Sequence, residues 1–201
     1  MNGLAGIFGQ LAVETLRQPR MAARRLIGWD LPPGARFTAL VLAAVLSILS
    51  FLASFAISPP AEIPAIFALM TNPWLGVPLQ VASQLVLALI MTLSGRAQGA
   101  KGRFADAVVL VAMVQVLLAA GQVLQTLIYL ALPILTLPLA LGVLALFVWI
   151  ITSFTAELHG LPGFLKPFGA LLLTFLLIMV VLAVIMSVLG FAPSVSGAGH
   201  V

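Results

Sequence analysis

Long apolar runs, broken by short clusters of charged residues, make up most of the chain. Stretches without Asp, Glu, Lys or Arg cover residues 37–61, 63–95, 107–156 and 167–201. A helix needs about 20 apolar residues to cross a bilayer, so the stretch 107–156 is about two spans long. Pro133 and Pro138 lie in its middle and favour a turn between two helices. The pattern predicts five transmembrane helices, at 37–57, 75–94, 106–131, 135–156 and 167–189.

The composition indicates that a bilayer, and not water, surrounds most of this surface. Hydrophobic residues make up 63% of the chain and charged residues 7%, whereas soluble domains have about 45–50% and about 25%. The apolar runs are continuous and lack the alternation of a β-barrel. We therefore expect an all-α membrane protein, a five-span transmembrane helical bundle preceded by an amphipathic cytoplasmic helix. No cysteine is present, which excludes disulfides and thiolate chemistry.

The basic residues fall on one side of the predicted bundle. They precede the first span or lie in the loops after the second and fourth spans, and these places account for all nine. Short loops rich in Lys and Arg stay in the cytoplasm. The N-terminus is therefore expected in the cytoplasm and the C-terminus outside. Residues 1–35 then form a cytoplasmic region, 36–190 the membrane domain and 191–201 a flexible extracytoplasmic tail.

The N-terminal segment predicts helices with one apolar face. Leu4, Ile7, Phe8 and Leu11 share one side of a helix, and a second helix begins at Pro19. Two interpretations fit this pattern: a basic amphipathic helix lying on an anionic cytoplasmic leaflet, or a helix packed on the cytoplasmic end of the bundle. In the first interpretation, the residues that contact anionic lipid headgroups are Arg17, Arg20, Arg24 and Arg25.

The segment ITSFTAELHGLPGFLK, residues 151–166, brings an acid, a histidine and a lysine close together in sequence. On a helix Glu157 and His159 point to different sides, and their spacing differs from a zinc-protease motif. We expect a membrane rim here, with contact to a partner or to lipid headgroups as the alternative, and no metal or acid–base site. Gly160 ends the helix, and the Lys166 ammonium extends toward water.

A second acid opens the third predicted span. Asp106 follows Arg103 and lies where the helix dipole favours a carboxylate. Capping of the helix is one expected role, and an ion pair with Lys166 or an N-terminal arginine is the other. The candidate contacts of the cytoplasmic rim are therefore Arg103, Asp106, Glu157, His159 and Lys166.

Polar side chains form one face of the third predicted span. Gln115, Gln122, Gln125 and Tyr129 fall within an arc of about 80° at about 100° per residue. An amide facing hydrocarbon leaves its donors and acceptors unpaired, so this face is expected either to pack against protein or to line a narrow wet cavity. The expected partners are Gln80 and Gln84 of the second span or the serines of the first span. These serines belong to a stripe of small residues that is expected to pack closely against another helix: Ala43, Ser47, Ser50, Ser54 and Ser58.

Two loop segments and the order of the spans resemble a known family. GAKGRFADAVVLV opens the third span, and ELHGLPGFLKPFGALL joins the fourth and fifth. Over about residues 20–190 the chain resembles the Yip family of Ypt/Rab-interacting membrane proteins, in its bacterial branch. The resemblance implies an integral protein of the bacterial inner membrane, with the N-terminus cytoplasmic and the C-terminus extracytoplasmic. Eukaryotic relatives are associated with prenylated small GTPases and vesicle traffic, but no segment here matches a nucleotide-binding P-loop.

No arrangement of residues in the sequence indicates catalysis. There is no nucleophile with an adjacent base, no paired carboxylates and no metal-binding set, and no cofactor is expected. We expect a non-enzymatic integral membrane protein that organises membrane or partner proteins, with an unidentified protein or a second copy of the chain as partner. The alternative is a small transporter or channel-like subunit whose path the glutamines line. Nucleic-acid binding is not expected, because the basic residues are scattered.

Overall fold

The computed structural model of the chain describes residues 4–59, 68–96, 99 and 102–188. Within these ranges the regular elements are α-helices and short 3-10 turns, with no strand, so the predicted all-α class is confirmed there. The helices are α1 (Leu4–Arg17), α2 (Pro19–Gly28), α3 (Pro33–Ile57), α5 (Pro73–Arg96), α6 (Phe104–Ala131), α7 (Thr136–His159) and α8 (Leu165–Val188). The 3-10 turns are η1 (Leu69–Thr71) and η2 (Pro133–Leu135).

Each predicted span overlaps one of these helices. Helices α3, α5, α6 and α7, the last together with η2, are long and apolar enough to cross a membrane. The described apolar part of α8, Leu165–Val181, is shorter. The structure therefore supports a multi-pass membrane protein, while five crossings stay a prediction. The predicted tail at 191–201 lies outside the described residues.

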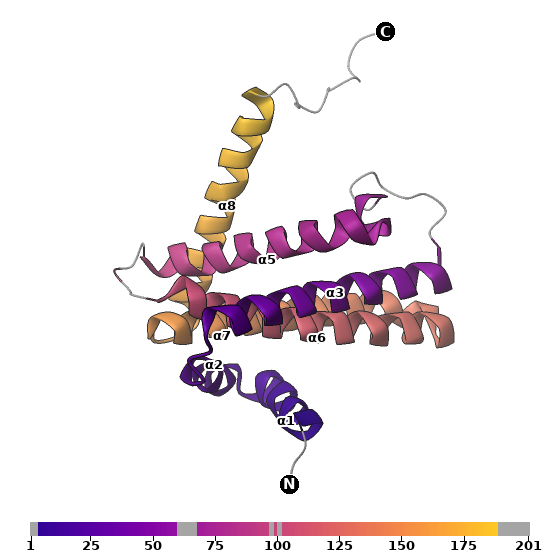
Figure 1. Cartoon of the computed structure of the whole chain (residues 1–201), viewed down its shortest axis with the longest axis horizontal. Helices are drawn as coiled ribbons and strands as arrows, with labels where there is room; N and C mark the ends of the chain where they lie inside the picture. The colour runs from indigo at the N-terminus through magenta and orange to yellow at the C-terminus, as the bar shows by residue number, and fades with distance from the viewer. Residues whose placement is uncertain (1–3, 60–67, 97–98, 100–101, 189–201) are drawn as a thin grey trace.

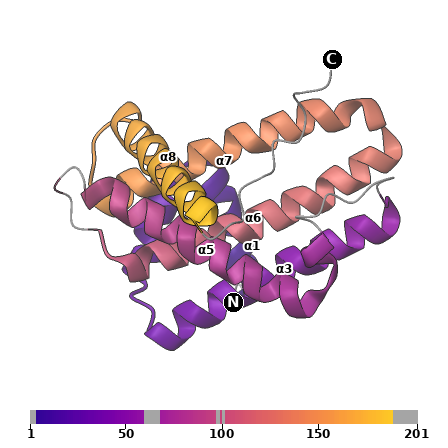
Figure 2. The ribbon, with the colours of Figure 1, turned by 90° about the horizontal axis from the view of Figure 1, so that it is seen from above.

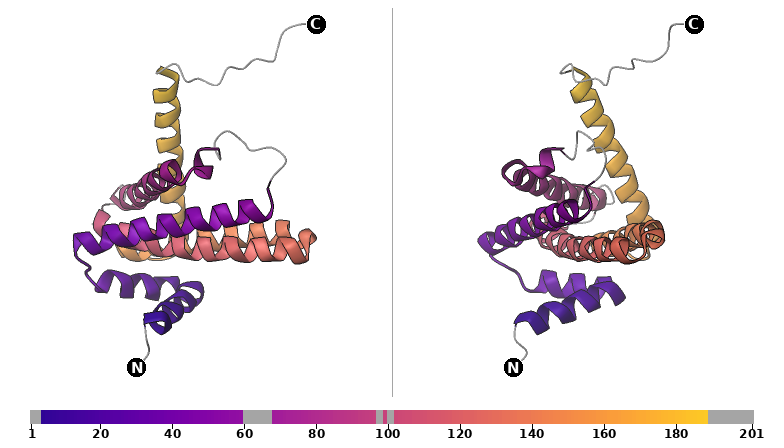
Figure 3. Two further views of the ribbon diagram at one scale, coloured as in Figure 1. Left: turned by 45° about the vertical axis from the view of Figure 1, so that its right-hand side comes forward. Right: turned by 90° about the vertical axis from the view of Figure 1, so that its right-hand side faces the viewer.

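The helices are arranged in layers (Figures 1 and 3). Helices α3, α6 and α7 run along the long axis of the molecule, α5 lies over one face of this layer, and α1 and α2 lie against the opposite face. Seen from above, α6 and α7 form a hairpin (Figure 2). Helix α8 contacts α5 and α7 near its start and then rises steeply away from the layer.

The two ends of the bundle differ in charge. Because consecutive long helices run in opposite directions, the start of α3, the end of α5 and the start of α6 meet at one end. That end carries Arg36, Arg96 and Arg103 and is called the basic end. The opposite end, which holds the α6–α7 turn at η2, is called the far end.

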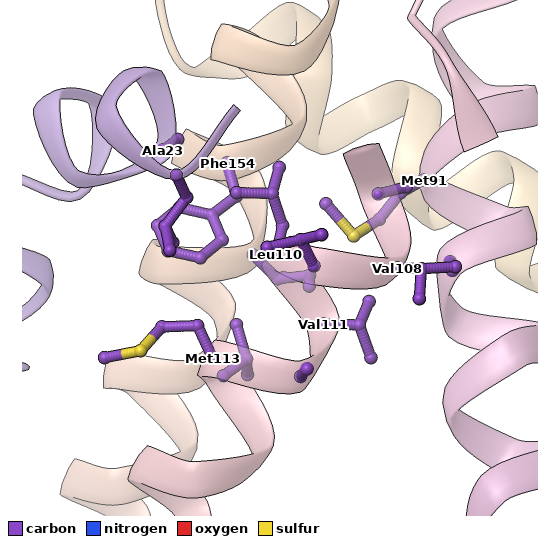
Figure 4. Packing of buried hydrophobic residues seen from close by; sticks show 14 of the residues in the cluster. Ala23, Met91, Val108, Leu110, Val111, Met113 and Phe154 are labelled. Atoms are coloured by element: carbon purple, nitrogen blue, oxygen red, sulfur yellow. The ribbon is translucent and has the colours of Figure 1, made fainter. Parts of the chain in front are cut away.

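The tightly packed core lies near the basic end. Every residue of α6 from Asp106 to Val114 is buried, and so is every residue of α7 from Ile150 to Ala156. Figure 4 shows Leu110 of α6, Phe154 of α7 and Met91 of α5 in this core. Large apolar side chains are exposed toward the far end: Leu124, Leu127, Leu130, Ile134, Leu137 and Leu141. Hydrocarbon, which is as apolar as leucine, is the surrounding that the far end fits.

The most extensive helix contact joins α3 and α6. Ala43, Ser47 and Ser50 are buried on α3, and the hydroxyls of Ser47 and Ser54 bond to side chains of α6. Small residues let two helix backbones approach closely in lipid. The stripe of small residues in the first span is thus the face of α3 that packs against α6.

Helix α2 is packed on the bundle. Ala22 and Ala23 are 0% exposed and Leu26 is buried, and Ala23 lies beside Phe154 of α7 in Figure 4. The opposite face of α2, which includes Arg24, is exposed. Of the two interpretations of the N-terminal region, the structure describes packing on the bundle. Contact of the outward arginines with lipid stays a prediction.

Enlarging the contact between α2 and α7 should detach α2. Ala23→Leu adds apolar atoms where the side chain is 0% exposed, and overpacking of this kind costs about 1–3 kcal/mol. We expect a lower midpoint of thermal unfolding in detergent and faster proteolysis between α2 and α3. Ala53→Leu, at an exposed position of α3, is the matched control and should leave both unchanged. Equal behaviour of the two variants would show that α2 is not docked in solution.

Candidate functional site

A buried arginine organises the charged residues at the basic end. Nη1 of Arg36 lies 3.4 Å from Oδ1 of Asp106, and the two side chains are 8% and 9% exposed. Arg36 also donates from Nη2 to Oδ1 of Asp30 at 2.9 Å, and from Nε to the carbonyl oxygen of Leu31. Removing one partner of such a buried pair leaves an uncompensated charge and costs about 3–5 kcal/mol. Arg36 therefore joins the α2–α3 link, α3 and α6.

Arg103 completes a balanced set of charges around Arg36. Its guanidinium lies 3.6 Å from Asp30 and 3.9 Å from Asp106, so two arginines face two aspartates. Asp106 lies in the first turn of α6, where the helix dipole stabilises a carboxylate. Asp30 has a φ of 38°, in the left-handed region that Asp adopts more readily than most residues. Of the pairings expected for Asp106, the structure describes the one with an N-terminal arginine, Arg36.

His159 joins three segments at the end of α7. Its Nδ1 accepts a hydrogen bond from the N–H of Gly102 at 3.1 Å, and its Nε2 is 2.9 Å from the carbonyl oxygen of Met91. A backbone N–H only donates and a backbone carbonyl only accepts, so these contacts fit the tautomer with its proton on Nε2. The ring thereby connects α7 to the end of α5 and to the segment before α6.

Two glycines make room for this ring. A Cβ placed on Gly95 would overlap the imidazole of His159, and one placed on Gly102 would lie 2.5 Å from its Cε1 atom. A larger residue at either position would therefore displace the ring. No local pattern marks these glycines, because Gly102 and His159 are 57 residues apart in sequence.

Glu157 and the α7–α8 turn hold the N-terminal helices. Nε of Arg24 lies 2.8 Å from Oε1 of Glu157, and Arg20 donates to the carbonyl oxygen of Gly163. The hydrogen bond to Glu157, and then its charge, raise the pKa of Arg24 above its usual value, so this guanidinium stays charged. Gly160, with a φ of 64°, ends α7 as expected. The segment between α7 and α8 is thus a joint between the bundle and α2.

These side chains do not converge on a ligand. Glu157 and His159 hold different partners, and Lys166 is exposed in the first turn of α8. Glu14 pairs with Arg25 at 3.1 Å and so fastens α1 to α2. Within the described residues no group of three or more His, Cys, Asp or Glu could hold a metal ion. The contacts of the rim residues fasten helices to one another.

The glutamine-bearing face of α6 meets α3 in two ways. Gln115 packs against α3, where its Nε2 donates to Oγ of Ser47 at 2.9 Å. Nearer the far end, a cavity of about 330 Å³ opens between the two helices. Its polar lining includes Ser54, Ser58, Gln122, Gln125, Thr126 and Tyr129. One part of the face therefore packs against protein and the other part lines a cavity.

The glutamines of α5 lie apart from this cavity. Gln84 is 2% exposed, and neither its Oε1 nor its Nε2 has a hydrogen-bond partner within the described residues. Gln80 is half-buried, and its backbone carbonyl accepts a bond from Ser83. The expected bonds from α6 to these two glutamines are not found in the described part of the chain. Ser47 takes the amide of Gln115 instead.

Comparison with protein-family models identifies the family of this chain. The family model of the Yip1 domain matches residues 13–186. The chain belongs to the Yip1 family. The matched range contains α2, the charge network around Arg36, the contacts of His159 with Gly102 and Met91, and most of α8. No curated protein and no solved structure matches the chain.

Filling the space around the histidine should loosen the basic end of this Yip1-family protein. Gly95→Ala places a methyl group against the His159 ring, so we expect a lower midpoint of thermal unfolding. Gly142→Ala is the matched control and should not lower this midpoint. Nothing lies within 4 Å of a Cβ there, and Ala favours a helix over Gly by about 1 kcal/mol.

The same overlap predicts coupling between the two sites. In a His159→Ala background, Gly95→Ala should cost much less than it does in the parent chain, because the ring that the methyl group displaces is gone. The free energies of unfolding of the two single variants and the double variant measure this coupling. Additive effects would contradict the contact.

Proposed function

We propose that this Yip1-family chain is a non-enzymatic protein of the bacterial inner membrane that organises partner proteins or membrane lipids at its basic end. The observation that carries the proposal is the docking of α2: Ala22 and Ala23 are buried on the bundle, and Arg17 and Arg20, where α1 meets α2, have no acid within ion-pair distance among the described residues. The ion pair from Arg24 to Glu157 adds a second point of attachment. A basic surface held in one orientation suits an anionic leaflet or an acidic partner.

The titratable groups at the basic end support a role without catalysis. Glu14, Asp30, Asp106 and Glu157 each lie within ion-pair distance of an arginine. Both ring nitrogens of His159 are hydrogen-bonded. General acid–base catalysis needs a group that can reach the substrate proton. These five groups are engaged in joining helices, so we assign them positioning roles.

A transport path along the glutamine-bearing face of α6 receives less support. The cavity between α3 and α6 lies toward the far end, and the Gln115–Ser47 bond follows it on the side of the basic end. Beyond that bond, α6 is buried on all sides from Asp106 to Val114. The polar face therefore does not continue to the basic end, whereas a transporter gives its site access to both sides of the membrane.

We propose five membrane crossings with the basic end in the cytoplasm. Helix α8 has 24 residues and no charged residue after Lys166, which is long enough for a helix that crosses a bilayer. Arg36, Arg96 and Arg103 lie at one end, and loops rich in Lys and Arg stay in the cytoplasm. This orientation places the N-terminus in the cytoplasm and the C-terminus outside.

Single cysteines should report this orientation, since the chain has none of its own. Pro59→Cys, after α3, should react with a membrane-impermeant maleimide in intact cells. Pro162→Cys, between α7 and α8, is the matched exposed position at the basic end and should react only after permeabilisation. Reaction of the second variant in intact cells would overturn the orientation.

A photoreactive residue should show whether the basic end meets a protein. Trp29 follows α2 and is 40% exposed, so benzoylphenylalanine in its place should form discrete adducts with a protein partner or a second copy of the chain in native membranes. The same adducts should weaken in the Ala23→Leu background, which detaches α2. Benzoylphenylalanine at Leu137, exposed at the far end, is the control. Absence of protein adducts above that control would refute a partner-binding role for the basic end.

A further inference from the structure

Two neighbouring cavities lie along α7 on the side that faces α1 and α2. The first, of about 370 Å³, is an apolar groove between α6 and α7, with Leu16 of α1 at its edge. Gly121 and Gly142 form part of its wall, and the absence of side chains there leaves the groove open. The second, of about 410 Å³, is lined by Arg17, Arg20, Trp149 and Ser153.

The linings of the two cavities contain residues that are neighbours in the chain. Leu16 lines the groove and Arg17, the next residue, lines the basic cavity. On α7, Ile150 lines the groove, while its neighbour Trp149 and the residue one turn further on, Ser153, line the basic cavity. Together they form one surface that is apolar toward the far end and positively charged toward the basic end.

Within the part of the chain that the structure describes, no acid neutralises the charge of the second cavity. The acids nearest in sequence and structure are taken: Glu14 pairs with Arg25, and Glu157 pairs with Arg24. Among the described residues no acid lies within ion-pair distance of Arg17 or Arg20. The bond from Arg20 to the carbonyl of Gly163 fixes that side chain beside the cavity and leaves further N–H donors of the guanidinium for a ligand.

We infer that this surface is a binding site for one anionic phospholipid. An acyl chain lies in the groove between α6 and α7, and the phosphate bonds to Arg17 and Arg20, because arginine donates in the fork geometry that phosphate accepts. Trp149, 36% exposed, lines the basic cavity and is followed in sequence by Ile150 of the groove, and Trp rings favour the boundary between hydrocarbon and headgroups. A zwitterionic lipid fits less well, because each acid in the described part of the chain already lies within ion-pair distance of an arginine and none is left for the ammonium group.

The inference rests on the proposed placement of the basic end at an anionic leaflet, and native mass spectrometry of the purified full chain tests it. The chain is mixed with phosphatidylglycerol or phosphatidylethanolamine, and the lipid that stays bound is counted. We expect one phosphatidylglycerol per chain. The double variant Arg17→Gln, Arg20→Gln should retain phosphatidylglycerol about tenfold less, and Arg96→Gln, an exposed arginine elsewhere at the basic end, should not.

The groove has its own variant. Gly142→Leu places a side chain where nothing lies within 4 Å of a Cβ, so the helix tolerates the change while the groove is filled. Retention of phosphatidylglycerol should fall although both arginines are present. Inorganic phosphate, added as a competitor, should displace little lipid if the acyl chain contributes. Equal retention of the two lipids, an equal loss in Arg96→Gln, or no loss in Gly142→Leu would each overturn the site.

These outcomes separate the lipid site from the proposed role. Specific retention of phosphatidylglycerol without protein adducts at Trp29 would leave the site in place and remove the partner-binding role. Protein adducts at Trp29 with non-selective lipid retention would do the reverse. Cysteine labelling that places Pro162 outside the cell would remove the anionic cytoplasmic leaflet as the source of the lipid, and with it the inference.

Discussion

The buried Arg36–Asp106 pair is the contact on which the basic end depends. It lies where α3 and α6 begin, and these helices meet elsewhere through small residues and uncharged hydrogen bonds. A buried pair is favourable only when its remaining hydrogen-bonding groups are satisfied. Asp30 and the carbonyl of Leu31 accept hydrogen bonds from Arg36, and the charge of Arg103 lies 3.9 Å from Asp106. Because the network sits at the helix ends, it aligns α3 with α6 without placing charge deep in hydrocarbon. The α2–α3 link is held by the same arginine, and α2 gains a defined position from it.

The contrast between a closed basic end and an open far end follows from side-chain size. At the basic end, Ala22 and Ala23 let α2 approach the bundle, and Gly95 and Gly102 leave space for the ring of His159. Toward the far end, the α6–α7 hairpin carries large exposed apolar side chains and encloses grooves instead of a core. The protein itself therefore determines the shape of the basic end, whereas the surrounding lipid completes the far end. A binding surface that must keep one shape is therefore expected at the basic end.

The positions of the helices can be predicted from the sequence, but most of their contacts cannot. The length of an uncharged apolar run can be read from the sequence of that run alone. The expected spans 37–57 and 106–131 accordingly lie within the helices Pro33–Ile57 and Phe104–Ala131. The face of α6 that meets α3 is also local, because four polar residues share one side of the helix. The space around His159 could not be predicted in this way. Gly95 and Gly102 leave room for a ring that is far away in sequence, and their own neighbours in the chain give no sign of it. The direction of α8 is equally hidden, because apolar residues cover all its sides and favour no single neighbour.

The attachments of α2 have a consequence for how the protein is made. Arg24 meets Glu157, which is 133 residues later in the chain, and Arg20 meets the carbonyl of Gly163, which is 143 residues later. Ribosomes add residues one at a time from the N-terminus, so α2 is complete long before the surface of α7 that receives it. Until then Arg20 and Arg24 lack these partners, whereas Arg25 can already pair with Glu14 of α1. Docking of α2 is therefore a late step of biogenesis, and its exposed state marks chains whose later helices have not yet been inserted.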